Sequence, residues 1–332
     1  MNFWYNPRVR AVLYQLMIAS TLGLAGWYFF SNLFENLRLQ GIASGFDFLG
    51  STAGFSIIMH LIPYEEASSY GRAFLVGLLN TLVVSTIGII FSTAIGFAVG
   101  VARLSSNYLL AKCAAAFVEL MRNIPLLLLI FIFYFGVLRH LPDPDHSLTF
   151  GPNVFLNNRG LYLPFWVRDA AGSGLSWSVP VFEGFDFTGG IVAIPEFVSL
   201  TVALTLYTAG FIAEIVRAGI QAVSKGQVEA ALSLGLTQAQ TMRLIVMPQA
   251  MQVIVPPLAS QFLNLTKNST LAAAIGFPDL VQVFAGTVLS QTGQAVEVIA
   301  ITMAVYLTIC LAIAFVMNQY NHRTQVRERT AS

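Results

Sequence analysis

Six apolar stretches, each about as long as a membrane-spanning helix, constrain this chain more than any other feature. A helix needs about 20 consecutive, mostly apolar residues to cross the hydrocarbon core of a bilayer. The stretches lie at about residues 11–30, 72–102, 112–138, 191–217, 247–267 and 295–318. They predict an all-α, polytopic membrane protein with about six transmembrane helices, because a helix pairs all of its backbone polar groups within lipid.

The composition leaves little room for a water-soluble domain. Hydrophobic residues make up 56% of the 332 residues and charged residues only 10%, whereas a soluble domain carries about 25% charged residues. The net charge of +1 argues against nucleic acid as a partner, since nucleic acid binding needs a strongly basic surface. Cys113 and Cys310 fall in apolar stretches and lack the spacing of a metal or redox site.

The distribution of charge predicts which side each loop faces. The first apolar stretch follows Arg8 and Arg10 and has no cleavage site before a polar region, so we expect an uncleaved anchor. Positive charge collects in cytoplasmic loops. A net charge of +2 is found in residues 1–10, 103–122, 217–249 and 321–332, and a net charge of −2 in residues 31–72 and 139–190. Both termini are therefore predicted to be cytoplasmic.

These patterns divide the chain into three parts. Residues 1–70 would hold the anchor and an outer-face segment, 71–320 the transmembrane domain, and 321–332 a cytoplasmic tail. Within the first part, residues 41–58 are apolar but contain four glycines and Asp47, so we expect an interfacial or tucked-in segment and not a crossing. Within the second part, residues 139–190 should form an ordered periplasmic cap or a docking site for a partner.

The cytoplasmic loop at 219–248 has the signals of a helix-turn-helix. Ser224-x-x-Gln227 and Thr237-x-x-Gln240 have the spacing of capping boxes, and Gly235 lies where a helix would end in a left-handed residue. We expect a helix at about 225–234 and a second one from 238 that enters the membrane at Pro248.

The loop could be no more than a helical turn in the cytosol. A DNA-binding helix-turn-helix is excluded, because Lys225 and Arg243 are its only positive charges and the membrane follows at once.

The loop resembles a motif of the membrane subunits of ATP-binding-cassette importers. EAALSLGLTQAQTMRLIVMP at 229–248 is similar to the family pattern EAA-x3-G-x9-I-x-L-P, with Met247 in place of the usual Leu. Residues 79–105, 117–136, 203–235 and 247–276 resemble core helices of the polar amino acid branch. RNIP at 122–125 and KNST at 267–270 are similar to the general L-amino acid and the glutamate/glutamine/aspartate types, which favours the Q-type subunit.

The resemblance implies a five-helix importer core of type I after the anchor helix, in a bacterial inner membrane. It also implies that the loop is the coupling helix that seats in an ATP-binding-cassette ATPase dimer. The residues expected at this contact are Gly226, Gln227, Glu229, Ala230, Ala231, Leu232 and Gly235. The other expected partners are a second homologous permease subunit, a periplasmic amino-acid-binding protein and an L-amino acid substrate. The chain has no G-x-x-x-x-G-K-[ST] motif, so we expect no cofactor in it, no enzymatic activity, and ATP and Mg on the partner.

Polar residues inside apolar stretches are candidates for the substrate pathway, because an ionised group at the middle of a span costs about 2.5–3.5 kcal/mol. Glu119 and Arg122 are three residues apart, as are Glu214 and Arg217, so each pair could form on one helix face or only anchor helix depth. The other candidates are Asn80, Thr81, Asn264, Lys267, Asn268, Ser269 and Thr270.

Each of these candidates has a structural alternative. Pro256 and Pro257 should kink their helix and place Lys267 beside a cavity, where it could meet a substrate carboxylate. Lys267 could instead pair permanently with Glu119 or Glu214. Asn80 and Thr81 could serve helix packing alone, and Pro125 could serve to bend its helix.

Two other classes of function are alternatives to an importer subunit. A self-sufficient secondary transporter would need inverted repeats and a coupling-ion site of buried carboxylates, and neither is evident in six unequal stretches. A membrane-embedded enzyme would need a catalytic motif, but H-E-x-x-H and G-x-S-x-G are absent and the four histidines are scattered.

Overall fold

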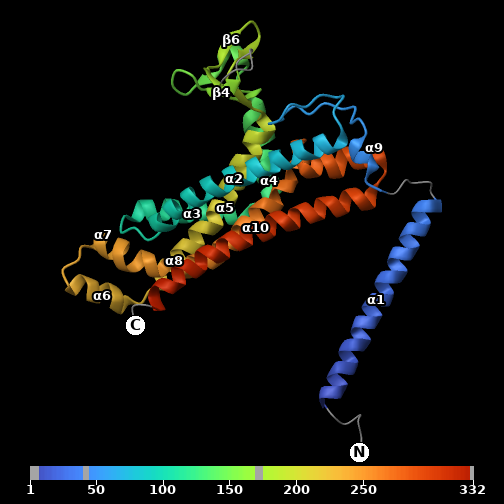
Figure 1. The fold of residues 1–332 in the computed structure, drawn as a ribbon. Coiled ribbons are helices and arrows are strands. Elements are labelled where there is room, and N and C mark those ends of the chain that lie inside the picture. Colours follow the sequence, from blue (N-terminus) through green and yellow to red (C-terminus); the bar gives the residue numbers. More distant parts are fainter. Residues whose placement is uncertain (1–6, 40–44, 169–174, 330–332) are drawn as a thin grey trace, which may run out of the picture.

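The computed structural model describes residues 7–39, 45–168 and 175–329, and these residues are mostly helical (Figure 1). The long helices are α1 (Pro7–Leu39), α2 (Tyr70–Ala102), α3 (Tyr108–Asn123), α5 (Pro195–Gln221), α8 (Met247–Asn268) and α10 (Ala295–Arg329). The short α-helices are α4 (Leu126–Phe131), α6 (Lys225–Ser233), α7 (Gln238–Thr241) and α9 (Leu289–Thr292). The connecting segments include the π-helices η3 (Ile132–Val137), η6 (Met242–Val246) and η8 (Val281–Val288), and the 3-10 helices η2 (Asp47–Gly50), η4 (Leu138–His140), η5 (Pro144–His146) and η7 (Ser269–Ile275).

The number of crossings agrees with the sequence, but one predicted crossing is bent. Five helices of the described chain are long and apolar enough to cross a membrane, and a bent pair would be the sixth. The expectation of a single helix over 112–138 is wrong, because Tyr108–Asn123 and Leu126–His140 meet at an angle of 106°. Proline disfavours helical backbone at the residue before it, and Ile124 before Pro125 is extended, with φ −87° and ψ 128°.

The segment that follows the anchor is tucked into the bundle. Figure 1 shows α1 lying apart from the other helices, and its apolar side chains are exposed. After α1, Phe48, Ala53, Ile57 and Tyr64 are buried, and they pack with residues of α2 and η8. Of the two possibilities for residues 41–58, the described part follows the tucked-in one; residues 41–44 lie outside the described residues.

Helix α5 lies at the centre of the bundle, in contact with α2, α3, α4 and α8. Small residues let these helices approach closely. A Cβ at Gly96 would lie 2.6 Å from the Ile212 side chain, and one at Gly100 would lie 2.7 Å from the Ala213 carbonyl oxygen. Gly96 and Gly100 form a G-x-x-x-G pattern on α2, so this pattern fixes the crossing of α2 and α5.

Two glycines of α5 itself extend the same close packing to α3 and α8. A Cβ at Gly210 would lie 2.9 Å from the Met121 side chain of α3. A Cβ at Gly219 would lie 2.3 Å from the Ile254 side chain of α8. Three of the neighbours of α5, namely α2, α3 and α8, are therefore positioned by close contacts at glycines.

A small β module interrupts the helical chain between η5 and α5, where the sequence predicts an ordered cap but no strands. Its strands are β1 (Leu148–Thr149), β2 (Phe155–Asn157), β3 (Gly160–Leu163), β4 (Phe165–Arg168), β5 (Leu175–Ser178), β6 (Val181–Glu183), β7 (Asp186–Thr188) and β8 (Ile191–Ala193). They form one antiparallel sheet in the order β1-β2-β3-β8 and two hairpins, β4–β5 and β6–β7. Figure 1 shows the module projecting from the helices, so the all-α prediction holds for the membrane part alone.

Helix α8 does not break where the sequence predicts. It runs uninterrupted through Pro256 and Pro257 and continues into η7. The chain turns at Gly276 instead, which has the left-handed φ of +75° that glycine adopts without strain. The π-helix η8 then returns against α2 and α10. The break therefore lies after the polar cluster at 267–270 and not before it.

Gly100→Val should destabilise the protein, because its side chain would collide with the backbone of Ala213 and with Val216. Overpacking of this kind costs about 1–3 kcal/mol, and we expect a lower thermal unfolding midpoint in detergent. Gly136→Ala is the matched control, since a Cβ at Gly136 meets nothing within 4 Å. Equal midpoints for the two variants would contradict the close contact between α2 and α5.

Candidate functional site

The first candidate site is the α6–α7 hairpin, which the structure forms as the sequence predicts. Helix α6 ends at Ser233, and Gly235 follows shortly after it with a left-handed φ of +86°. The Gly235 amide donates to the Leu232 carbonyl at 2.9 Å and the Leu236 amide to the Ala231 carbonyl at 3.2 Å. These bonds satisfy carbonyls that the end of a helix leaves open. Gly235 therefore provides the turn between the two helices.

Only one of the two predicted capping boxes exists. Thr237 accepts from the Gln240 amide at 3.3 Å, and the Gln240 side chain accepts from the Thr237 amide at 2.9 Å. The box predicted at Ser224 is wrong, because its hydroxyl makes no capping bond. The Gln227 amide donates to the backbone carbonyl of Ser224 instead, at 3.1 Å, so this donor is already satisfied.

The hairpin buries one face and exposes the other. Val228, Met242 and the buried Ala231 lie on the inner side, where Val228 and Met242 pack with the end of α5. The remaining predicted coupling residues are exposed: Gly226, Gln227, Glu229, Ala230, Leu232 and Gly235. Leu234 at the tip is 84% exposed. Sequence reasoning missed Leu234, although an apolar residue beside the turn glycine of a loop is a signal of an intermolecular contact.

A charged network joins α2, α3 and α5 at the end of the bundle that carries the hairpin, which we call the hairpin end. Glu214 forms ion pairs with Arg217 on its own helix and with Arg103 at the end of α2. Arg122 of α3 lies 4.0 Å from Glu214 and over the ring of Phe211, 5.5 Å from its centroid. One carboxylate therefore ties three helices together.

The network differs in part from the pairs that sequence spacing suggests. The Glu214–Arg217 pair is present, but the described residues contain no ion pair between Glu119 and Arg122, and Glu119 is exposed. Sequence reasoning also missed Arg103, because a contact between residues more than a hundred positions apart leaves no trace in local spacing.

The second candidate site is a polar stripe on α8 that faces away from the core. Ser260, Asn264 and Lys267 are exposed and follow one another at the four- and three-residue spacing that places them on one helix face. Among the described residues the Lys267 ammonium has no ion pair, so the predicted pairing with Glu119 or Glu214 is absent. A lysine facing lipid is costly, and this face therefore needs a polar environment outside this chain.

The other predicted polar residues lie deeper. Asn268 and Thr270 are half-buried and Ser269 is buried, and Thr270 donates to the carbonyl of Lys267 at 2.8 Å. Asn80 and Thr81 are fully buried. Asn80 donates to the carbonyls of Met59 and Pro278, both at 2.8 Å, and Thr81 accepts from the Leu280 amide at 3.0 Å. These contacts are those of packing residues and not of an open pathway.

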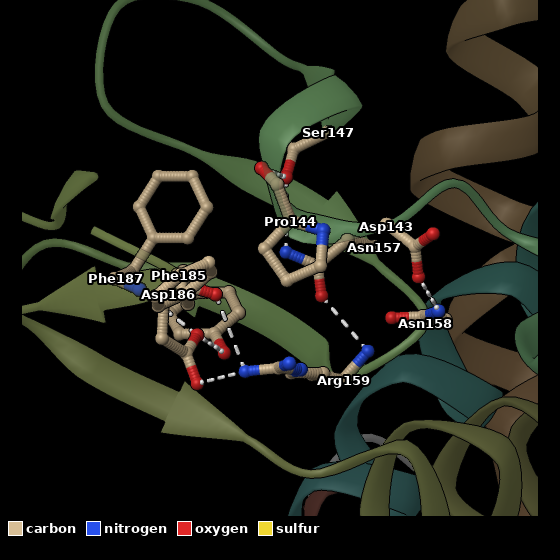
Figure 2. A network of polar contacts seen from close by, with 10 residues as sticks. Asp143, Pro144, Ser147, Asn157, Asn158, Arg159, Phe185, Asp186 and Phe187 are labelled. Atoms are coloured by element: carbon tan, nitrogen blue, oxygen red, sulfur yellow. Dashed lines mark hydrogen bonds and ion pairs between the residues drawn. The ribbon is translucent and has the colours of Figure 1, made fainter. Parts of the chain in front are cut away.

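The β module carries a polar network of its own (Figure 2). Arg159 donates to Asp186 at 2.8 Å, and the hydroxyl of the buried Tyr162 donates to the same carboxylate at 2.7 Å. Burial raises the pKa of Tyr162, and the bond to Asp186 raises it further. Burial alone would also raise the pKa of Asp186, but bonds from Tyr162, the Phe187 amide and Arg159 outweigh it and lower that pKa. The network fastens strand β3 to β7.

The described residues contain no group of three or more His, Cys, Asp or Glu side chains that could hold a metal ion. An open cavity of about 380 Å³ lies in the β module, lined by residues that include Pro144, Asn153, Phe155, Phe182 and Phe187. The β module also exposes aromatic side chains, among them Trp166 and Trp177, which are paired across β4 and β5 with ring centroids 5.4 Å apart.

Comparison with known proteins relates this arrangement to membrane transport. Residues 92–326 match the family model of binding-protein-dependent transport system inner membrane components. A putative amino-acid ABC transporter permease protein, YhdX of Escherichia coli K12, is 47% identical over 98% of this chain and 96% of its own length. The general L-amino acid transport system permease protein AapQ of Rhizobium johnstonii is 42% identical over 98% of this chain and 94% of its own length.

A solved structure has the same fold. The crystal structure of an amino acid ABC transporter with histidines aligns with a TM-score of 0.56 and 28% identity, over 76% of this chain and 95% of that one. The α6–α7 hairpin and the bundle around α5 agree with the family match. This chain belongs to the family of binding-protein-dependent transport system inner membrane components, as a multi-pass membrane permease subunit.

Proposed function

We propose that this chain is the transmembrane permease subunit of an ATP-driven amino acid importer and forms half of its translocation pathway. The observation that carries the proposal is the α6–α7 hairpin, which exposes Leu232 and Leu234 at 42% and 84%. Two exposed leucines at the tip of an otherwise polar hairpin favour a docking surface. The names of the relatives, which are amino acid permeases, supply the substrate class.

The partner at this surface is an ATP-binding-cassette ATPase dimer, which binds ATP and Mg. This chain has no phosphate-binding loop, so the energy for transport comes from outside it. Closure of the two ATPase subunits on ATP would draw the hairpins of two permease subunits together. The expected contact residues are those of the exposed face of α6, with Gly226 and Ala230 allowing a close approach.

The helical connection between hairpin and pathway supports this mechanism. Residues Gln238–Ile275 form one helix of 38 residues that starts in the hairpin and carries the polar stripe. At 1.5 Å per residue it is about 57 Å long. A displacement of the hairpin would therefore move Lys267 directly. Glu214 and its three arginines hold the hairpin ends of α2, α3 and α5 together, so that they move as one body.

The polar stripe of α8 would face the pathway and a second, homologous permease subunit. The resemblance to Q-type subunits favours a heterodimer. Lys267 would meet the carboxylate of an amino acid, with Asn264 beside it on the same face. The β module would receive a periplasmic amino-acid-binding protein, and the hairpin and both termini would then lie in the cytoplasm of a bacterial cell. The charge distribution of the loops supports this orientation.

Gly235→Val tests the hairpin. A β-branched residue at φ +86° is strained by about 1–2 kcal/mol, so the turn should distort while the bundle inserts normally. We expect normal membrane levels, weaker co-purification of the ATPase and amino acid uptake lowered at least about fivefold, as a loss of about 1 kcal/mol implies. Gly235→Asn is the matched control, because asparagine tolerates the left-handed conformation. Normal uptake by the valine variant would show that the hairpin is not the coupling element.

Lys267→Ala tests the pathway. A charge-assisted hydrogen bond to the substrate carboxylate contributes about 1.5–3 kcal/mol, so uptake should fall about tenfold or more. Receptor-stimulated ATP hydrolysis should continue, because Lys267 is far from the hairpin along the helix. Lys112→Ala serves as the control for loss of a lysine, since Lys112 lies over the Tyr108 ring on α3. If Lys267→Ala transports like the wild type, the lysine has no role in binding substrate.

A further inference from the structure

Asp279 is a buried acid that the proposed transport mechanism does not use. It lies between the turn at Gly276 and the start of η8, and its side chain is 0% exposed. No ion pair among the described residues includes it. An ionised carboxylate buried without a cation is strongly disfavoured and takes up a proton instead.

The two carboxyl oxygens of Asp279 have different surroundings. One oxygen accepts from the Gln282 amide at 2.8 Å, and the Val281 amide lies beside the carboxyl as well. The other oxygen, Oδ2, is buried and has no hydrogen-bond partner among the described residues. The first oxygen therefore caps η8, and the second is free to carry a hydrogen atom.

The side chains around Asp279 are neutral and rich in oxygen. Helix α2 contributes Asn80 and Thr81, whose side chains hold the backbone of residues 278–280. The segment η7 contributes Ser269, and α10 contributes the hydroxyl of Tyr306, which lies near Thr81, Ser269 and Asp279. Tyr306 is the one titratable group that faces Asp279 within the described chain, and it is itself uncharged at neutral pH.

An open acceptor in the same cluster favours a protonated carboxyl. Asn80 donates through both hydrogens of its amide nitrogen, to Met59 and Pro278, while its Oδ1 is buried without a donor. A hydrogen on Asp279 Oδ2 adds a donor to a cluster that has unpaired oxygens. An ionised carboxylate would instead leave Oδ2 as a further buried acceptor without a donor. Such unsatisfied groups would destabilise the contact.

We propose that Asp279 is a positioning residue that acts as a neutral, protonated carboxylic acid. It caps η8 through one oxygen and, through its O–H, stabilises the contact between residues 277–280 and α2. The contact is tight, because a Cβ at Gly77 would lie 3.0 Å from Leu280 Cα and 3.1 Å from the Asp279 carbonyl oxygen. Water that entered this contact would allow the acid to ionise, so alkaline conditions should loosen it.

Infrared difference spectroscopy of the purified full chain tests the proposal directly. At neutral pH the spectrum of wild type minus Asp279→Asn should contain the C=O stretch of one protonated carboxylic acid. Asp279→Glu should shift that band and not abolish it, which keeps the test valid if the asparagine variant fails to fold. Absence of the band from both difference spectra would overturn the proposal. The measurement needs no transport, so a chain that shows the band but supports no uptake would count against the proposed function alone.

The pH dependence of stability is the second readout. A group that is protonated when buried and ionised in water stabilises the folded state at low pH, and this stabilisation is lost as pH rises. Between about pH 5 and pH 7, where the carboxyl is ionised in the unfolded chain and still protonated in the folded one, the unfolding midpoint of the wild type should fall by at least about 2–4 °C more than that of Asp279→Asn, because each pH unit there changes the unfolding equilibrium about tenfold. Asp279→Ala, which lacks the cap, should be less stable at every pH. Parallel pH profiles for wild type and Asp279→Asn would contradict a protonated acid.

Discussion

The close contact between α2 and α5 is the constraint on which the rest of the fold depends. In a bilayer, burying apolar side chains provides little drive for helices to associate, so close packing and polar contacts must hold them. Gly96 and Gly100 bring the two backbones together, and Gly210 and Gly219 extend the same packing to α3 and α8. The ion pairs of Glu214 then join three of these helices at one end. Helix α8 therefore packs against a helix, α5, that is held in place by its other neighbours.

Two polar side chains of the bundle, Lys267 and Asp279, lie in different surroundings. Lys267 keeps its charge on an exposed face of α8, where only another subunit, water or a substrate can satisfy it. Asp279 lies inside a closed cluster of neutral side chains, where we infer that a proton removes the charge. The first arrangement suits a group that exchanges partners during transport. The second suits a group that holds two segments in place.

The sequence predicts local features well where one strong signal decides them. Apolar length gave the crossings, and Thr237 and Gly235 gave the shape of the hairpin, because caps and turns depend on a few adjacent residues. The bend at Pro125 follows from the same kind of local signal, since a proline restricts the residue before it. Ser224 shows the limit of such signals, because a backbone carbonyl replaced its hydroxyl as the acceptor.

Features that depend on distant residues were not predictable. The strands of the β module are not predictable from the sequence, because each is two to four residues long and too short to show an alternating pattern. The pair between Arg103 and Glu214 and the burial of Asp279 arise only when distant segments pack together, whereas the sequence does suggest helix packing as a role of Asn80 and Thr81. Pro256 and Pro257 do not interrupt α8, and the chain turns at Gly276 instead.

We infer that this chain supplies the pathway and the hairpin, while another protein supplies the energy for transport. The most direct test compares amino acid accumulation in vesicles that contain ATP and this chain alone with accumulation in vesicles that contain the assembled complex with its ATPase, second permease subunit and receptor. We predict accumulation against a gradient by the complex and none by the chain alone. Accumulation by the chain alone would contradict the account and indicate a self-sufficient transporter.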